Sequence, residues 1–258
     1  MKDYKLYLID LDGTVYRGED TISSGVDFVR RIQKEGKDYL FLTNNTTRTS
    51  KMVVEKLSKH GVKTDLKHVY TSSMATATYI LNKHPYNKKI GVYIIGEIGL
   101  KSELLVQHSE FELNEKNPEY VIVGMDTDLT YHKVRVATRA IRNGATFIGT
   151  NADMNLPLGD ELIPGNGSQC EFIAAATGKR PFYIGKPEAI IVDMALKLTG
   201  HTREETLIVG DNYNTDIQAG FNSDVDQLLT LTGVTTKEEI IGKRQPTIVV
   251  NNLNEYKL

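Results

Sequence analysis

Short apolar runs that alternate with segments of helical periodicity are the strongest constraint on the fold of this chain. The runs at residues 6–9, 39–42 and 206–209 have the length of strands and lack polar alternation, which is typical of strands buried on both faces of a sheet. Segments with apolar residues at helical spacing follow the first two runs. This order of strand, helix and strand predicts an α/β fold, a doubly wound parallel sheet with helices on both faces.

A second alternating series begins after the polar stretch 82–89. In it we expect strands near 91–95, 120–123 and 146–148, with helices near 100–107, 131–142 and 171–176. The chain then returns to the first domain with strands near 181–184 and 228–231 and a helix near 215–220. We therefore expect a core of residues 1–81 and 180–258, into which a smaller α/β domain, residues 82–179, is inserted.

The composition favours a globular protein that acts on small molecules. Hydrophobic residues make up 40% of the 258 positions, charged residues make up 25%, and the net charge is only -2, which is unlike the basic footprint of a nucleic-acid binder. The apolar runs fall short of the roughly 20 residues that span a bilayer, and the first residues lack a secretory signal. Cys170 is the single cysteine and fits a reducing compartment. We expect a cytoplasmic protein without nucleic-acid or membrane partners.

Polar residues directly follow the expected core strands. Asp10 and Asp12 follow the run 6–9, and Asp211 follows the run 206–209 after one glycine. Ligands of parallel sheets gather at the carboxyl ends of the strands, and two residues at positions i and i+2 can face the same ligand. Because clustered carboxylates raise one another's pKa, this arrangement calls for a cation, and Mg²⁺ prefers carboxylate oxygens together with substrate phosphate.

Four stretches of the chain resemble, in the same order, the four motifs of haloacid dehalogenase superfamily phosphatases. They are Asp10-Leu11-Asp12-Gly13-Thr14, Thr43-Asn44-Asn45, Gly185-Lys186-Pro187, and Gly210-Asp211-Asn212 with Thr215-Asp216. The inserted domain resembles the cap of the NagD-like branch, which includes phosphatases of sugar phosphates, nucleotides and 4-nitrophenyl phosphate. The resemblance implies a Rossmann-like core, a large α/β cap, and Mg²⁺-dependent hydrolysis of small phosphomonoesters, either sugar phosphates or nucleoside monophosphates.

The resemblance also implies a role for each motif residue. Asp10 would attack phosphorus and form an aspartyl-phosphate, and Asp12 would act as general acid and then as general base. Mg²⁺ would be held by carboxylate oxygens of Asp10 and Asp211 and by the backbone carbonyl of Asp12. The phosphoryl oxygens would be bound by Thr43 and Lys186, with further donors from Asn44 and Asn45. Asp216 would orient Lys186 or a metal-bound water.

Two other functions remain open on the sequence alone. A phosphotransferase or mutase could use the same aspartyl-phosphate, and a regulatory module could bind phosphorylated ligands without turnover, although intact Asp10 and Asp12 argue against the module. Substrate choice is expected to reside in the cap near residues 151–167, and caps of this branch suggest a possible homodimer. At Asp224 the family usually has glycine, so we expect a local difference in the backbone there.

Overall fold

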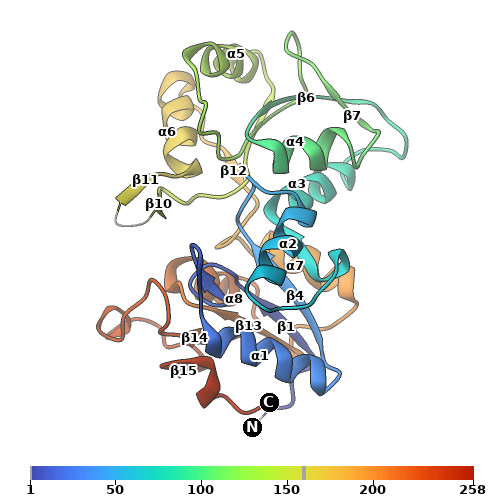
Figure 1. Cartoon of the computed structure of the whole chain (residues 1–258). Coiled ribbons are helices and arrows are strands. Elements are labelled where there is room, and N and C mark those ends of the chain that lie inside the picture. Colours follow the sequence, from blue (N-terminus) through green and yellow to red (C-terminus); the bar gives the residue numbers. More distant parts are fainter. Residues whose placement is uncertain (1, 159–160) are drawn as a thin grey trace. The chain divides into compact units, whose positions relative to one another are not determined.

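The computed structural model describes residues 2–158 and 161–258, which form two compact units (Figure 1). Unit 1 comprises the residues up to Thr43, Ser50–Tyr70 and Lys186–Leu258, and unit 2 comprises Asn44–Thr49 and Thr71–Gly185. The division thus precedes helix α3 (Ser72–Leu81), which packs with α4 (Ile98–Leu105) in unit 2. The expected domain bounds of 1–81, 82–179 and 180–258 had placed this helix in the core.

Unit 1 is built on a sheet with the strand order β15-β14-β13-β1-β4-β5. These strands are β1 (Leu6–Ile9), β4 (Asp38–Thr43), β5 (Val69–Thr71), β13 (Thr206–Gly210), β14 (Asp226–Thr230) and β15 (Ile248–Val250). β1 runs parallel to both β4 and β13, with Ile9 level with Phe41 and with Val209. The carboxyl ends of these three strands therefore lie side by side.

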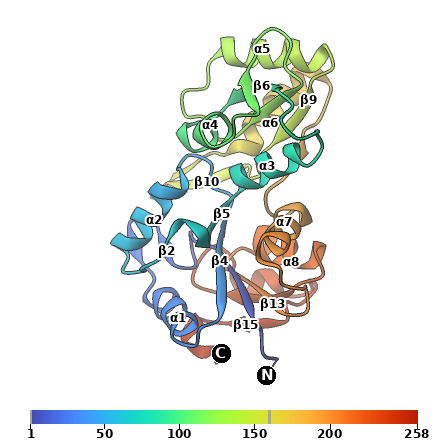
Figure 2. The ribbon, with the colours of Figure 1, turned by 90° about the vertical axis from the view of Figure 1, so that its right-hand side faces the viewer.

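Helices cover both faces of this sheet (Figure 2). In Figure 2, α1 and α2 lie on one side of it and α7 and α8 on the other. The helical segments are α1 (Ser23–Lys34), α2 (Ser50–Lys59), α7 (Ala189–Thr199) and α8 (Gln218–Asn222), with short turns η1 (Leu66–His68), η2 (Tyr213–Ile217), η3 (Glu238–Ile240) and η4 (Leu253–Glu255). A hairpin of β2 (Tyr16–Arg17) and β3 (Asp20–Thr21) follows β1.

The core of unit 1 explains why its strands are continuously apolar. Tyr7 and Ile9 pack with Phe28 of α1 and Leu57 of α2 on one face of the sheet. The alternate residues of β1 point to the opposite face and are equally buried. Every position of β1 is thus removed from water, as the sequence predicts for a central strand of a parallel sheet.

Unit 2 contains a parallel sheet of its own, in the order β12-β9-β8-β6-β7, and an antiparallel hairpin, β10-β11. The strands are β6 (Ile90–Ile95), β7 (Phe111–Leu113), β8 (Tyr120–Val123), β9 (Thr146–Gly149), β10 (Asn155–Leu158), β11 (Glu161–Pro164) and β12 (Phe182–Tyr183). Helices α5 (Tyr131–Arg142) and α6 (Asn166–Thr177) pack together over one face. The segment 151–167, expected to govern substrate choice, carries the β10-β11 hairpin, and its residues 159–160 lie outside the described part of the chain.

The long elements match the expected positions, and one helix differs. Near residues 215–220 the chain forms a π-helical turn, η2, and only then the short helix α8. None of the helices in the ranges 2–158 and 161–258 combines the length and the apolar character needed to cross a membrane.

Candidate active site

The candidate site lies at the carboxyl edge of the unit 1 sheet, where the strand order changes direction. The chain proceeds from β1 outward to β4 and β5, whereas β13, β14 and β15 lie on the other side of β1. Such a switch point is where open α/β sheets bind ligands. Asp10 follows β1 and Asp211 follows β13, so the two carboxylates flank this point. The Asp10 amide donates to Val209 O at 2.8 Å, which continues the ladder into the site.

Lys186 connects the carboxylates of this edge. Its Nζ atom donates to Asp10 Oδ1 at 2.6 Å, to Asp216 Oδ1 at 2.7 Å and to Leu42 O at 2.9 Å. The residue is only 2% exposed. Burial by itself would lower the pKa of this amine, but the two carboxylates raise its pKa above the usual value. Lys186 therefore carries a fixed positive charge between Asp10 and Asp216.

The π-helical turn η2 brings Asp216 to Lys186. Asp216 Oδ2 accepts a hydrogen bond from the Asn212 amide at 3.0 Å, while its Oδ1 accepts from Lys186. Gly210 makes this approach possible, because a Cβ atom there would lie 2.2 Å from Asp216 Oδ2. Both carboxylate oxygens are thus fixed, and the side chain is buried.

Asp211 is held by the loop that follows β14. Its Oδ2 accepts from the Val234 amide at 2.6 Å, and its backbone carbonyl accepts from the Thr235 amide at 3.2 Å. A Cβ atom at Gly233 would lie 1.8 Å from Asp211 Oδ2, and one at Gly13 would lie 2.3 Å from the same atom. Two glycines therefore leave the space that this carboxylate occupies.

The donor set fits a divalent cation. Carboxylate oxygens of Asp10, Asp211 and Asp216 lie within 4.8 Å of one another, and Lys186 forms ion pairs with Asp10 and Asp216. Burial, together with the neighbouring acids Asp216 and Asp211, raises the pKa of Asp10 well above its usual range. Burial and Asp216 raise the pKa of Asp211 to about 7. A cation bound between these oxygens would offset the excess negative charge, and hard oxygen ligands suit Mg²⁺.

Asp12 and Thr43 lie beside this cluster in different environments. Asp12 follows Asp10 by two residues, and its side chain is exposed. Thr43 is the last residue of β4, the neighbour of β1, and is buried. The expected role of Asp12 as general acid and base stays a prediction.

Asn44 and Asn45 belong to unit 2. Asn45 Oδ1 accepts from the amides of Thr47 and Arg48 at 3.0 and 3.1 Å, which stabilises the turn that follows. Asn44 Nδ2 donates to Asp153 Oδ2 at 3.1 Å. These contacts connect both residues to unit 2, and their expected contact with a phosphoryl group stays a prediction.

Sequence reasoning did not find the loop of residues 231–235 that holds Asp211. Thr232 is a further member, since its Oγ1 donates to Gly13 O at 2.8 Å. The available signal was the Thr232-Gly233 pair directly after a buried strand, which marks a tight turn at the carboxyl edge.

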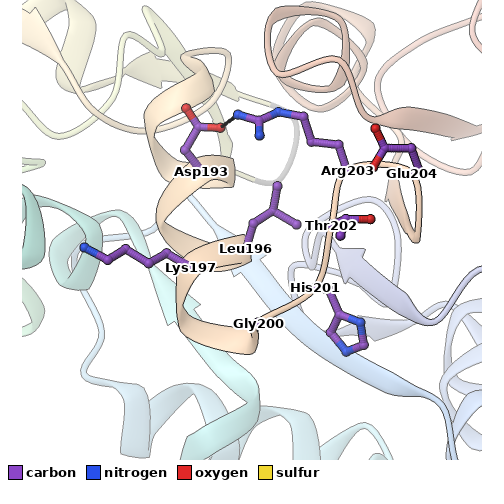
Figure 3. A pocket seen from close by; sticks show the side chains of 8 residues that line it. All are labelled: Asp193, Leu196, Lys197, Gly200, His201, Thr202, Arg203 and Glu204. Atoms are coloured by element: carbon purple, nitrogen blue, oxygen red, sulfur yellow. Dashed lines mark hydrogen bonds and ion pairs between the residues drawn. The ribbon is translucent and has the colours of Figure 1, made fainter.

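A pocket of about 490 Å³ lies at the opposite edge of unit 1 (Figure 3). It is formed by the end of α7 and the segment before β13, and His201 there bonds Asp38 at 2.8 Å, at the first residue of β4. Asp193 and Arg203 point toward each other across it, 2.6 Å apart. This ion pair occupies both of these side chains, and we assign the pocket no chemistry.

The chain matches known families and proteins over nearly its whole length. A family model described as haloacid dehalogenase-like hydrolase matches residues 7–108, and a related model of HAD-like hydrolases matches residues 183–256. YutF of Bacillus subtilis strain 168, named a 5'-nucleotidase, is 43% identical over 257 residues, covering 99% of this chain and 98% of that protein. An acid sugar phosphatase of Staphylococcus aureus strain USA300 is 41% identical over 256 residues, covering 99% of this chain and 97% of that protein.

Solved structures show the same fold. A thermostable NPPase double mutant from Geobacillus stearothermophilus superposes with a TM-score of 0.91 at 42% identity, covering 100% of this chain and 99% of that one. NagD from E. coli K-12 superposes with a TM-score of 0.91 at 31% identity, covering 99% of each chain. Together with the carboxylate cluster at the sheet edge, these matches show that the chain belongs to the NagD-like branch of the haloacid dehalogenase superfamily.

Proposed function

We propose that this phosphatase hydrolyses small phosphomonoesters, sugar phosphates or nucleoside monophosphates, with Mg²⁺ and through an aspartyl-phosphate on Asp10. The observation that carries the proposal is the bridge from Asp10 through Lys186 to Asp216, with Asp211 close by. The substrate class is supported by relatives that are named a 5'-nucleotidase and acid sugar phosphatases. A panel of substrates tests whether the enzyme prefers sugar phosphates or nucleoside monophosphates.

Asp10 is the proposed nucleophile. Lys186 binds Asp10 Oδ1 at 2.6 Å and so fixes the orientation of the carboxylate. A carboxylate oxygen of Asp10 attacks phosphorus, the bond from phosphorus to the ester oxygen breaks, and a phosphorylated Asp10 results. Lys186 and Thr43 stabilise the phosphoryl oxygens, and Asp216 keeps Lys186 in place through the 2.7 Å contact. Asn44 and Asn45 follow Thr43 directly and are proposed as further donors.

Asp12 is the proposed general acid and base. It gives its proton to the departing ester oxygen, and it then removes a proton from the water that attacks the phosphorylated Asp10. Its exposed side chain supports this role, because a carboxyl group that exchanges protons must reach substrate and water. The site thus divides its labour between a buried nucleophile and an exposed proton carrier.

Mg²⁺ would be held by carboxylate oxygens of Asp10 and Asp211 and by the backbone carbonyl of Asp12, where it would neutralise the charge that the phosphoryl group brings. The Val234 amide and the space left by Gly233 hold Asp211 ready for this role. The cytoplasmic location and a homodimer through the cap stay predictions.

Phosphate release from sugar phosphates, nucleoside monophosphates and 4-nitrophenyl phosphate, with Mg²⁺ or EDTA, tests the proposal. We expect phosphate release in the presence of Mg²⁺ and none in EDTA. Asp10→Asn should release none in either case, because an amide cannot act as the nucleophile. Asp193→Asn, in an ion pair with Arg203, is the matched control and should keep full activity. Metal-independent release, or an active Asp10→Asn variant, contradicts the mechanism. Transfer of phosphate to a second hydroxyl in place of water would favour a phosphotransferase, and binding without turnover a regulatory module.

The two metal roles can be separated by calorimetric Mg²⁺ titration. Asp211→Asn should weaken Mg²⁺ binding about tenfold or more, roughly 1.4 kcal/mol, because it removes a charged ligand. Asp12→Asn should keep more of the Mg²⁺ affinity while it loses turnover, because residue 12 is proposed to bind the metal through its backbone carbonyl, which the substitution leaves in place. Equal losses of affinity in the two variants would overturn this assignment.

A further inference from the structure

The backbone around Asp12 is held by the hairpin that follows it in unit 1. The Gly13 amide donates to Tyr16 O at 2.7 Å, and the Tyr16 amide donates to Leu11 O at 3.2 Å. Asp12 and Tyr16 also form an isolated bridge. The residues on either side of Asp12 are therefore bonded to Tyr16, so the place of Tyr16 sets the place of Asp12.

The ring of Tyr16 is in turn held by α2 and the residue after it. His60 stacks on the ring, with centroids 4.8 Å apart and planes at 22°, and Lys56 Nζ lies 4.1 Å from the ring centroid. Tyr16 is 5% exposed, and both partners are largely buried. We call Tyr16, Lys56 and His60 the Tyr16 stack.

The Tyr16 stack also fixes the second strand of the hairpin. His60 Nδ1 and Thr21 Oγ1 lie 2.8 Å apart, in hydrogen-bond contact. The contact of the Lys56 cation with the Tyr16 ring and the stacking of His60 on that ring are both directional interactions. A purely apolar contact would leave the ring free to turn. The Tyr16 stack thus holds both strands of the hairpin at the same end, where Tyr16 pairs with Thr21.

We propose that the Tyr16 stack positions Asp12 for protonating the ester oxygen as it departs. This inference rests on the proposed role of Asp12 as general acid. The chain of contacts runs from α2 through the ring of Tyr16 to the backbone on both sides of Asp12. Tyr16, Lys56 and His60 are positioning residues, because they act on the substrate only through Asp12.

The readout is the dependence of kcat/KM on the leaving group. An alkyl phosphate needs a proton on its ester oxygen as the bond breaks, whereas 4-nitrophenyl phosphate releases a stable phenolate and needs little help. Since kcat/KM includes the step in which the leaving group departs, a misplaced general acid penalises the alkyl phosphate selectively. A merely structural weakening lowers both substrates alike.

The variants are Tyr16→Leu and His60→Ala, with Tyr16→Phe as the conservative form that keeps the ring. We expect Tyr16→Leu and His60→Ala to lose about tenfold more kcat/KM on a sugar phosphate than on 4-nitrophenyl phosphate, a fraction of the ~10²–10⁴ that a general acid supplies. Tyr16→Phe should keep the ratio of the two kcat/KM values close to that of the wild type. All variants are compared at saturating Mg²⁺, because the Asp12 carbonyl is also a proposed ligand of the metal, and circular dichroism verifies that each variant folds.

A matched control exists in unit 2. Tyr79 has Lys83 Nζ 4.4 Å from its ring centroid and stacks on Phe182 at 5.2 Å, the same combination of cation and second ring. Tyr79→Leu should leave the ratio of the two kcat/KM values unchanged. Equal losses on both substrates in Tyr16→Leu and His60→Ala would overturn the inference.

Asp12→Asn distinguishes this inference from the proposed function. If Asp12→Asn also fails to penalise the sugar phosphate selectively, the assigned role of Asp12 is wrong. If Asp12→Asn shows the selective loss and the two stack variants do not, the role of Asp12 stands and the Tyr16 stack does not position it.

Discussion

At the scale of single residues, the site depends on charges that are buried only because each has a partner. Judged by its sequence neighbours alone, Lys186 would be expected at the surface. In the structure its Nζ atom contacts two carboxylates and a backbone carbonyl. Removing one partner of a buried pair costs about 3–5 kcal/mol, because the other charge is left without compensation. The pairing of Asp10 and Asp216 with Lys186 therefore matters for the stability of the folded protein as well as for the chemistry of the site.

The left-handed backbone conformation of Asp224 has a free-energy cost that can be measured. It lies between α8 and β14 with φ 53°, in the left-handed region that favours glycine. The sequence predicted a local difference in the backbone at this position. The structure places aspartate, one of the residues that tolerate this region, in the geometry a glycine would adopt without strain.

We expect Asp224→Gly to stabilise the protein by about 0.5–1 kcal/mol. Relief of roughly 1–2 kcal/mol of left-handed strain is offset in part by the freedom that glycine gains in the unfolded chain. Thermal melting should show a rise of about 2 °C with unchanged phosphatase activity. Asp224→Ala should have the opposite effect, and a loss of stability in Asp224→Gly would contradict this explanation.

At the scale of elements, the sequence located the long strands and helices because their apolar periodicity is local. The hairpins β2-β3 and β10-β11 were not expected, since strands of two to four mixed residues carry no periodic signal. The helix expected near 215–220 became η2 and α8. In η2 both oxygens of Asp216 bond groups outside the turn, Asn212 N and Lys186 Nζ, and a π-helical turn accommodates this where a regular helix was expected.

An ion pair after α4 should make the stability of unit 2 depend on pH. His108 Nε2 lies 3.3 Å from Glu103 Oε1, and this bond raises the pKa of His108 above 6.5 despite partial burial. The folded state therefore holds the proton more tightly than the unfolded state. The stabilisation is complete below about pH 6.5 and is lost as the pH rises through the folded pKa of His108.

We expect Glu103→Gln to destabilise the protein more at about pH 5.5 than at about pH 8.5. The difference should stay under about 1 kcal/mol, because both side chains are partly exposed. Chemical denaturation at the two pH values measures it. A penalty that is equal at both values, or larger at the higher one, would show that the pair does not titrate as described.

At the scale of the whole molecule, the carboxylates and Lys186 belong to one unit. Asp10, Lys186, Asp211 and Asp216 all lie in unit 1, whereas Asn44 and Asn45 begin the segment assigned to unit 2. A ligand that binds only the folded state stabilises what it contacts, by about 2.7 kcal/mol at 100 times its Kd. Mg²⁺ is therefore expected to act on unit 1.

Hydrogen exchange with and without saturating Mg²⁺ tests this expectation. Amides of β1 and β13 should exchange more slowly with Mg²⁺, while those of β6 and β8 in unit 2 should change little. Asp211→Asn should abolish the Mg²⁺ effect, because it removes a proposed ligand of the metal. Equal protection of both units in the wild type would show that the effect of the metal is not confined to unit 1.

The sequence by itself determined the fold class and the acids at the strand ends. Buried strands need continuous apolar residues, and polar groups at their carboxyl ends stand where the sheet meets its ligands. The tertiary structure decided which of these groups meet. Lys186 bonds Asp10 from 176 positions away, and Val234 bonds Asp211 from 23 positions away. The Tyr16 stack joins the segment after β1 to α2 in the same manner. Local periodicity encodes burial, whereas such contacts exist only after distant segments have packed.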